Sequence, residues 1–142
     1  MYRHILIPTD GSKLAERGVT HGLALAKSLG ATVSFIFVVE PFTEMSGRFL
    51  EAIATYAELR KEQAKSVLDS AANSAKTAGV SCETIQGESG QPHQAIIAAA
   101  ADKGCDLIVM SSHGRSGLSA LLIGSVTNKV LTHAKTPVLV CP

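Results

Sequence analysis

Residues 106–142 read DLIVMSSHGRSGLSALLIGSVTNKVLTHAKTPVLVCP, and the fold is best inferred by starting from this stretch. An apolar run, 107–110, stops at a small polar loop that contains Gly114. A second glycine, Gly124, precedes Ser125 and a helical pattern, after which the apolar run 138–140 follows. A strand that ends in a glycine-containing loop and leads to a helix N-terminus is a favourable place for a phosphate. The stretch therefore predicts a phosphate-binding loop.

The composition is that of one globular domain spanning residues 1–142. The length is usual for a single domain, and 46% hydrophobic residues suffice for a core. No apolar run approaches the roughly 20 residues of a membrane-spanning helix. The N-terminus, MYRHILIPTDGS, lacks the apolar stretch of a signal peptide. A net charge of +1 with scattered Lys and Arg argues against nucleic-acid binding. We expect a cytoplasmic protein that binds neither membranes nor nucleic acids.

The three cysteines, Cys82, Cys105 and Cys141, are odd in number and widely spaced. They form no CxxC motif and no Cys/His pair with the spacing of a zinc site. We interpret them as free thiols, as expected in a reducing cytoplasm. Four histidines are also dispersed and share no metal-ligand spacing: His4, His21, His93 and His133.

Strands and helices alternate along the whole chain. Apolar or alternating runs predict strands over 2–7, 31–39, 80–86, 105–110 and 138–141. Helical patterns predict helices over 13–29, 50–78, 93–103 and from 118 or 124 to 133, with an irregular loop over 42–49. Pro8 should end the first strand, and Ser12 should cap the first helix. Gly87 should begin the loop after the third strand.

This alternation predicts an open parallel sheet with helices on both faces, in the Rossmann-like class of α/β folds. Ligands of such sheets bind at the carboxyl ends of the strands, where the strand order reverses. The most polar and glycine-rich loops follow the first and fourth strands. We therefore predict that these two strands are neighbours, which gives a five-stranded sheet of order 3-2-1-4-5. The third strand is polar and alternating, as is typical of a sheet edge.

Each candidate side chain has a functional and a structural interpretation. Asp10, after the first strand, could accept a hydrogen bond from a ribose or a base, or could form a local turn. Ser111 offers a hydroxyl, and His113 could direct a ring nitrogen at a phosphate or simply pack. Arg115 could screen phosphate charge or remain solvated. Ser125 could donate to a phosphate or act as an N-cap.

Glycine and backbone groups complete the predicted site. Gly114 would let a phosphate approach the backbone closely. After Gly124, the N–H groups of Ser125 and Val126 would face the crevice at the positive end of a helix dipole.

The sequence lacks the common catalytic motifs. It contains no GxxxxGK[ST] loop, no GxGxxG and no GxSxG elbow. Glu40 follows the second strand without an obvious carboxylate partner. A receiver-type signalling domain would need an acceptor aspartate after the third strand, where Gln86-Gly87-Glu88 stands instead. We expect a binding module more than an enzyme.

Three segments resemble the universal stress protein family, in its small single-domain form. They are ILIPTDGS near the N-terminus, FVVEP at the end of the second strand, and MSSHGRSGLSALLIGSVTNKVLTHAKTPVLV. The resemblance covers the whole chain and implies the sheet order given above.

The ATP-binding branch of that family carries Gly, two residues, Gly, nine residues, Gly, then Ser or Thr. Gly114 matches the second glycine, and nine residues separate it from Gly124-Ser125. Ser111 replaces the first glycine and adds a side chain near the ribose and phosphates. The resemblance implies ATP binding that persists but is weakened by this serine.

The resemblance also implies roles for individual residues and a partner. The nucleoside would meet Asp10, the Val38 backbone, Pro8 and Thr9, with Met110 and Ser111 on the ribose side. The phosphates would lie on Gly114, Gly124, Ser125 and Val126, together with Mg or Mn. The family commonly dimerises through its last strand, here Val138 to Cys141, which would remove an exposed apolar edge.

Three functions remain open on the sequence alone. The first is an ATP-binding regulatory protein of the stress response, acting as a homodimer. The second is a dimeric interaction protein of the same family that has lost nucleotide binding. The third is an enzyme, either a slow ATPase or a hydrolase acting on nucleotides, in which Asp10 or His113 acts on water.

Overall fold

The protein is an alternating α/β chain, seen here in a computed structural model that describes residues 1–41, 50–114 and 122–142. The expected loop 42–49 and the candidate Arg115 lie outside the described residues. The elements are β1 (His4–Pro8), α1 (Lys13–Leu29), β2 (Thr32–Val39), α2 (Leu50–Ala78), β3 (Cys82–Glu88), α3 (Pro92–Asp102), β4 (Leu107–Ser111), α4 (Ser125–His133) and β5 (Val138–Cys141).

The five strands form one sheet of order β3-β2-β1-β4-β5, as predicted. All neighbouring pairs are parallel. The order reverses between β1 and β4, because the chain leaves β1 toward β2 on one side and later returns to pair β4 on the other. The loops after β1 and β4 therefore lie side by side at the carboxyl edge of the sheet.

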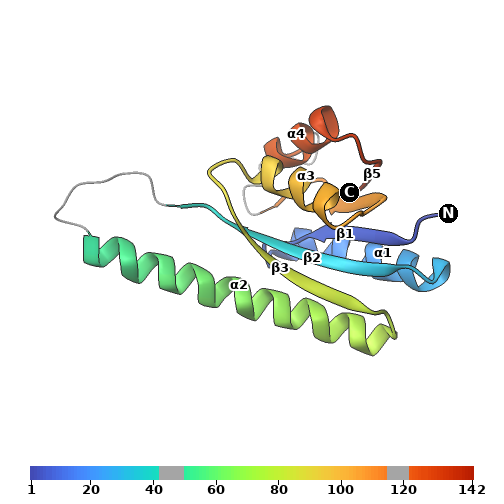
Figure 1. Ribbon diagram of the computed structural model, residues 1–142, viewed down its shortest axis with the longest axis horizontal. Helices are drawn as coiled ribbons and strands as arrows, with labels where there is room; N and C mark the ends of the chain where they lie inside the picture. The colour runs from blue at the N-terminus through green and yellow to red at the C-terminus, as the bar shows by residue number, and fades with distance from the viewer. Residues whose placement is uncertain (42–49, 115–121) are drawn as a thin grey trace.

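Helices cover both faces of the sheet (Figure 1). Helices α1 and α2 pack on one face over a core that includes Ile5, Ile7 and Phe35. Helices α3 and α4 pack on the other face over Leu6 and Ile108. The alternation of strand side chains between the two cores is what a sheet covered on both faces requires.

Local chemistry fixes the ends of α1. The Ser12 hydroxyl accepts a hydrogen bond from the Ala15 N–H at 3.1 Å, so the predicted N-cap is confirmed. Gly30 ends the helix with φ of 68°, in the left-handed region that favours glycine. Gly18 lets α1 approach β4 closely, because a Cβ there would lie 2.9 Å from the Ser111 nitrogen. Helix α1 therefore packs directly against the Ser111 backbone, where the candidate phosphate loop begins.

Several predicted strand boundaries were wrong, and β1 and β3 begin at His4 and Cys82, two residues later than predicted. The first strand was expected to stop at Ile7, but Pro8 is itself the last residue of β1, paired with Ile36, and the Thr9 N–H still donates to the Ile36 carbonyl at 2.9 Å. Gly87 belongs to β3, opposite Val38. β4 begins at Leu107 rather than at Cys105. In each case the neighbouring strand sets the limit of the ladder.

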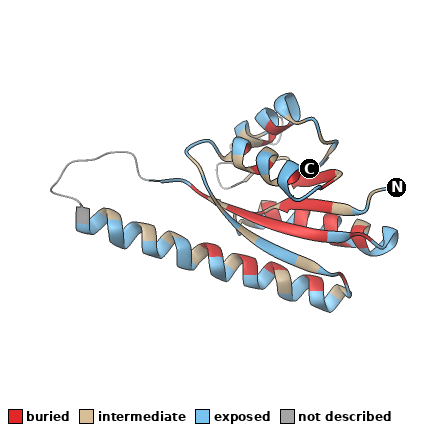
Figure 2. Cartoon of the chain, in the orientation of Figure 1, coloured by how far each residue is buried: buried red, intermediate tan, exposed pale blue. Residues whose placement is uncertain are grey.

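Burial follows the sheet, and the amino-terminal half of α2 is mostly exposed (Figure 2). Cys105 and Cys141 are buried, Cys82 is partly buried, and all three are free thiols as predicted.

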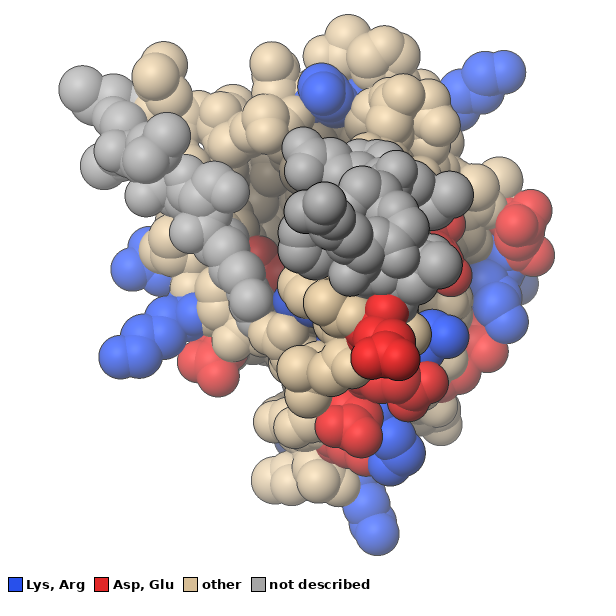
Figure 3. Space-filling view, turned by 90° about the vertical axis from the view of Figure 1, so that its left-hand side faces the viewer, with Lys and Arg blue, Asp and Glu red and all other residues tan. Residues whose placement is uncertain are grey.

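Within the described residues, no helix has the length and apolar character needed to cross a membrane. Lys and Arg are interspersed with Asp and Glu on the face that carries the strand carboxyl ends (Figure 3).

Candidate functional site

A cavity of about 510 Å³ lies at the carboxyl ends of the central strands. This volume is in the range of small-molecule sites. The structure brings together on its wall all the candidate residues that it describes: Pro8, Thr9, Asp10, Val38, Met110, Ser111, His113, Gly114, Gly124, Ser125 and Val126.

Asp10 forms the local turn that its structural interpretation predicts, and it also lines the cavity. Its Oδ1 accepts a hydrogen bond from the Ser12 N–H at 2.9 Å. The Thr9 hydroxyl oxygen accepts another from the Gly11 N–H at 3.2 Å. These two bonds orient the carboxylate and hold the loop after β1 in one conformation.

Gly114 lies directly against this carboxylate. A Cβ at this position would stand 2.6 Å from the Asp10 Oδ2, which is closer than real Cβ atoms come to a neighbour. The absence of a side chain at Gly114 therefore allows the loops after β1 and β4 to meet. Glycine is required here because the facing carboxylate leaves no room for a side chain.

The loop 111–113 is stabilised by its own hydrogen bonds. The Ser111 hydroxyl donates to the His113 carbonyl at 2.6 Å, and the Ser112 hydroxyl lies 3.0 Å from the His113 Nδ1. The Thr127 hydroxyl, on α4, donates to the Ser111 carbonyl at 2.9 Å. The side chain of Ser111 is thus engaged within the loop, and the residue is only 8% exposed.

His113 contributes a polar atom that the described protein leaves unsatisfied. Its Nδ1 is accounted for by Ser112, whereas its Nε2 is buried and has no hydrogen-bond partner among the described residues. A buried polar atom without a partner is unfavourable by about 1–3 kcal/mol. Because His113 lines the cavity, a ligand there could supply the missing partner.

The amino-terminal end of α4 also faces the cavity. Gly124 is the N-cap, with no side-chain capping bond, so of the two alternatives for Ser125 the N-cap is not the one seen. The first intrahelical bond runs from the Asn128 N–H to the Gly124 carbonyl at 2.9 Å. The N–H groups of Ser125 and Val126 therefore precede the first intrahelical donor, at the positive end of the helix dipole.

Gly124 joins this helix start to the loop after β4. Its N–H donates to the Ser112 carbonyl at 2.7 Å. A Cβ on Gly124 would lie 3.1 Å from that same carbonyl oxygen and 3.4 Å from the His113 Cα. A larger residue would push the two segments apart and change the shape of the cavity wall at the start of α4.

The sequence interpretation missed cavity residues that come from helices rather than from loops. Arg60 of α2 and both Pro92 and Ile96 of α3 line the cavity, as does Glu40 after β2. One signal was present in the sequence. Arg60 stands three residues after Ala57 and four before the buried Ala64, on the inward stripe of an amphipathic helix. An arginine in such a position needs a specific neighbour.

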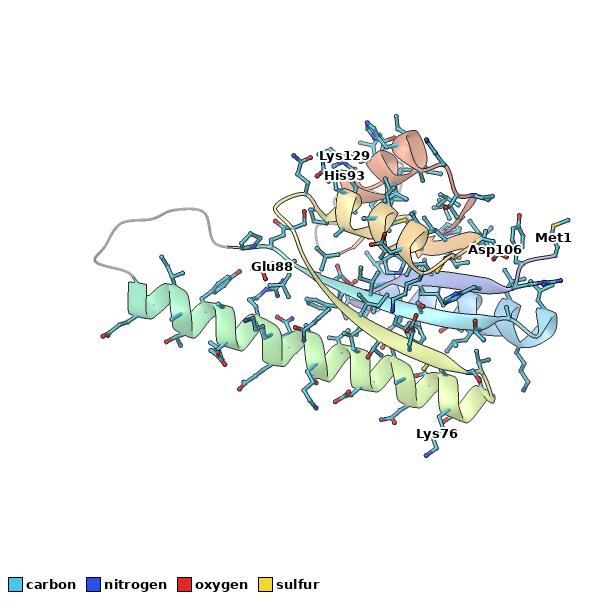
Figure 4. The ribbon with its side chains drawn as sticks, viewed as in Figure 1. Met1, Lys76, Glu88, His93, Asp106 and Lys129 are labelled. Atoms are coloured by element: carbon cyan, nitrogen blue, oxygen red, sulfur yellow. The ribbon has the colours of Figure 1, made fainter. Side chains whose placement is uncertain are left out.

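Several titratable groups with shifted pKa values lie away from the cavity. The hydrogen bond from the Ser34 hydroxyl to the Glu83 Oε1, at 2.8 Å, is the main cause that lowers the pKa of Glu83. Desolvation opposes the lowering of the Asp106 pKa, but hydrogen bonds from the N–H groups of Arg3 and His4 outweigh it. Asp106 lies beside the N-terminal segment, at the opposite end of the sheet (Figure 4). These groups stabilise the amino ends of the strands.

Comparison with known proteins gives one consistent result. The model of the universal stress protein family matches residues 1–142. The chain is 36% identical to Universal stress protein MJ0531 of Methanocaldococcus jannaschii over 99% of this chain and 82% of that protein. It is 33% identical to Universal stress protein YxiE of Bacillus subtilis, over 99% of both chains.

Solved structures agree in fold. The structure of the hypothetical protein MJ0577 superposes with a TM-score of 0.80 at 32% identity, covering 99% of this chain and 95% of that one. A universal stress protein in complex with cAMP superposes with a TM-score of 0.70 at 26% identity, covering 99% and 96%. The sheet order, the full-length family match and these relatives lead to one conclusion: the chain belongs to the universal stress protein family.

Proposed function

We propose that the protein binds ATP in the cavity at the strand ends and acts in the stress response as a regulatory binding module. One observation carries the proposal. A turn bearing an oriented carboxylate, at Asp10, shares a cavity with a glycine-bounded helix N-terminus at Gly124. Nucleotide sites of open α/β sheets combine these two features at the switch point of the strand order.

The wall chemistry fits the two ends of a nucleotide. Apolar side chains from Val38 and Met110 and the backbone near Pro8 suit a flat base and a ribose. The N–H groups of Ser125 and Val126 and the unsatisfied Nε2 of His113 suit phosphate oxygens. We assign the nucleoside to the β1 and β2 side and the phosphates to the start of α4.

A relative of known structure supports an adenine nucleotide as the ligand class. The universal stress protein solved with cAMP binds that nucleotide in a chain 26% identical to this one. Its ligand belongs to that protein, and we extend only the adenine-nucleotide class to this chain. The motif spacing from Gly114 to Gly124-Ser125 favours ATP within that class.

A divalent metal, Mg or Mn, would enter with the phosphates. Among the described residues, no group of three His, Cys, Asp or Glu side chains could hold a metal ion. Mg²⁺ commonly keeps several waters and binds through phosphate oxygens and one or two protein oxygens. The Ser125 hydroxyl, at the start of α4 where we assign the phosphates, is a cavity oxygen that could complete such a coordination shell.

Ser111 favours retained binding over the alternative of a family member that has lost its nucleotide. Its hydroxyl is directed to the His113 carbonyl at 2.6 Å, within the loop. The added side chain therefore stabilises the loop that carries the Nε2 of His113. A slow ATPase remains the third candidate, and it requires that Asp10→Ala or His113→Ala reduce a measured steady-state turnover.

We also propose a cytoplasmic homodimer that pairs through β5. β5 is an edge strand, and its Leu139 side chain is 43% exposed. Pairing the β5 strands of two copies would give hydrogen-bond partners to the unpaired backbone groups of this edge and would cover this leucine. Light scattering after size exclusion should show a dimer for the wild type and a monomer for Leu139→Lys. A wild-type monomer at all concentrations would contradict the dimer.

Thermal unfolding with Mg-ATP tests the proposed function. At a free concentration about 100-fold above Kd, a ligand that binds only the folded state adds about 2.7 kcal/mol of stability. We expect a Tm increase of several degrees for the wild type and none for Gly124→Val, whose side chain would displace the Ser112 carbonyl. Identical wild-type melting curves with and without Mg-ATP would refute ATP binding.

A further inference from the structure

A guanidinium from α2 reaches the wall of the cavity, at Arg60. Of the described residues that line the cavity, Asp10 and Glu40 carry carboxylates, and Arg60 is the one that carries a permanent positive charge. The family motif, which runs from the end of β4 to the start of α4, assigns no role to this position of α2.

Two contacts hold the Arg60 side chain in place. Its guanidinium carbon lies 5.5 Å from the centroid of the Phe37 ring, in cation–π geometry. Its Nη1 donates to the Oε1 of Gln63, one helical turn further along α2. The backbone beside it is also fixed, because the Gln86 side chain on β3 donates to the Lys61 carbonyl at 3.1 Å. The cation is therefore pre-oriented.

One donor of Arg60 is left without an acceptor. The Nε atom is buried and has no hydrogen-bond partner among the described residues. Neither the Phe37 contact nor the Gln63 bond satisfies this group. A buried charged donor without an acceptor is more unfavourable than a neutral one. Because Arg60 lines the cavity, a ligand bound there could supply the acceptor.

The position of Arg60 in the fold indicates which part of a nucleotide it would meet. Arg60 stands over Phe37 on β2, next to Val38. The start of α4 follows β4, which is separated from β2 by β1 in the sheet order. Two strand spacings place β2 about 10 Å from β4. Arg60 therefore belongs to the nucleoside end of the cavity, away from Gly124 and Ser125.

We propose that Arg60 is a ligand-binding residue that donates a charge-assisted hydrogen bond to the nucleoside part of the bound nucleotide. The acceptor is a ring nitrogen of the base or a ribose oxygen. This inference rests on the proposed nucleotide binding and gives α2 a direct contact with the ligand.

The test compares adenosine and Mg-ATP in competition with fluorescent mant-ATP. Arg60→Met retains the length of the side chain and removes its charge and donors, whereas Arg60→Lys retains the charge and removes Nε. Lys61→Met is the matched control, because Lys61 is an exposed neighbour on the same helix that does not line the cavity. Circular dichroism and unliganded Tm confirm that each variant is folded.

Arg60→Met should weaken adenosine binding about 10-fold, and ATP binding at least as much, because one charge-assisted hydrogen bond is lost. Arg60→Lys should also weaken adenosine binding, and Lys61→Met should bind like the wild type. Unchanged adenosine affinity in Arg60→Met would overturn the inference, even if ATP binding fell, since that result would place the cation at the phosphates. Failure of the wild type to bind any of the three probes would instead refute the proposed function itself.

Discussion

Ser111 stands where the family motif has its first glycine, and substitution of this serine distinguishes two interpretations of the difference. If the serine obstructs the site, Ser111→Gly should increase ATP affinity markedly. The geometry supports the opposite result, because the hydroxyl donates to the His113 carbonyl at 2.6 Å and the residue is only 8% exposed. Removing the hydroxyl would leave that carbonyl without this donor and release the loop that carries the His113 ring.

The magnitude follows from one buried hydrogen bond and one backbone change. Loss of the bond should lower the free energy of unfolding by about 1 kcal/mol. Glycine near the end of a strand should lower it by roughly 0.5–1 kcal/mol more. For a chain of this size, the sum corresponds to a Tm decrease of about 3–8 °C. Ser111→Ala should show the first contribution alone.

Denaturant unfolding and titration with Mg-ATP measure the two quantities independently. We expect Ser111→Gly to be less stable than Ser111→Ala, and both to bind ATP no more tightly than the wild type. The reasoning would be refuted if Ser111→Gly bound ATP about 10-fold more tightly, or if it unfolded at the wild-type denaturant concentration. The first result would mean that the serine obstructs the site, and the second that its hydroxyl does not stabilise the loop.

Three further predictions concern separate parts of the structure. Gly114→Ala should reduce ATP affinity about 10-fold or more, because a new methyl group would meet the facing carboxylate at 2.6 Å and force the two loops apart. Burial raises the pKa of Cys105 to about 11, so its thiol should resist Ellman's reagent at pH 8 in the folded protein and react in urea. The lowered pKa of Glu83 means that its carboxylate stabilises the folded state above the ordinary value of 4.5 and ceases to do so as the pH falls through the folded value. Glu83→Gln should therefore lower stability at pH 7 and flatten its decline in acid, as followed by urea unfolding.

The chain offers matched controls for these variants. Gly90→Ala suits the Gly114 substitution, since a Cβ at Gly90 would meet nothing within 4 Å and should leave ATP affinity unchanged. Glu88→Gln, at an exposed position of the same strand, suits Glu83→Gln. Equal effects at Gly114 and Gly90 would mean that close approach to Asp10 does not matter. Rapid labelling of Cys105 in the folded state would contradict its burial.

The sheet order could be predicted from the sequence because loop chemistry and topology are coupled. Polar, glycine-containing loops after the first and fourth strands indicated that these strands meet, and β1 pairs β4 in the structure. Exact strand ends could not be predicted, because they depend on pairing with the neighbouring strands of the sheet. Pro8 lacks a ladder donor, yet it closes β1, since its neighbour Thr9 still pairs with Ile36.

The candidate site could be predicted where it consists of loops and not where it consists of helix faces. Asp10, Gly114 and Gly124 follow strands or precede a helix, so their place at the carboxyl edge follows from the topology. The contributions of Arg60 and Ile96 depend on how α2 and α3 rotate and slide against the sheet. That docking is decided by packing between distant residues, which periodicity alone does not determine.

The central claim is that an adenine nucleotide binds in the cavity at the strand carboxyl ends. A titration of the ¹⁵N-labelled protein with Mg-ATP, followed by amide chemical shifts, tests both binding and location. We predict saturable shifts concentrated at the amides of Thr9, Gly114, Ser125 and Val126, with little change at the opposite end of the sheet near Asp106. The absence of shifts at millimolar Mg-ATP, or saturable shifts confined to the Asp106 end, would contradict the claim.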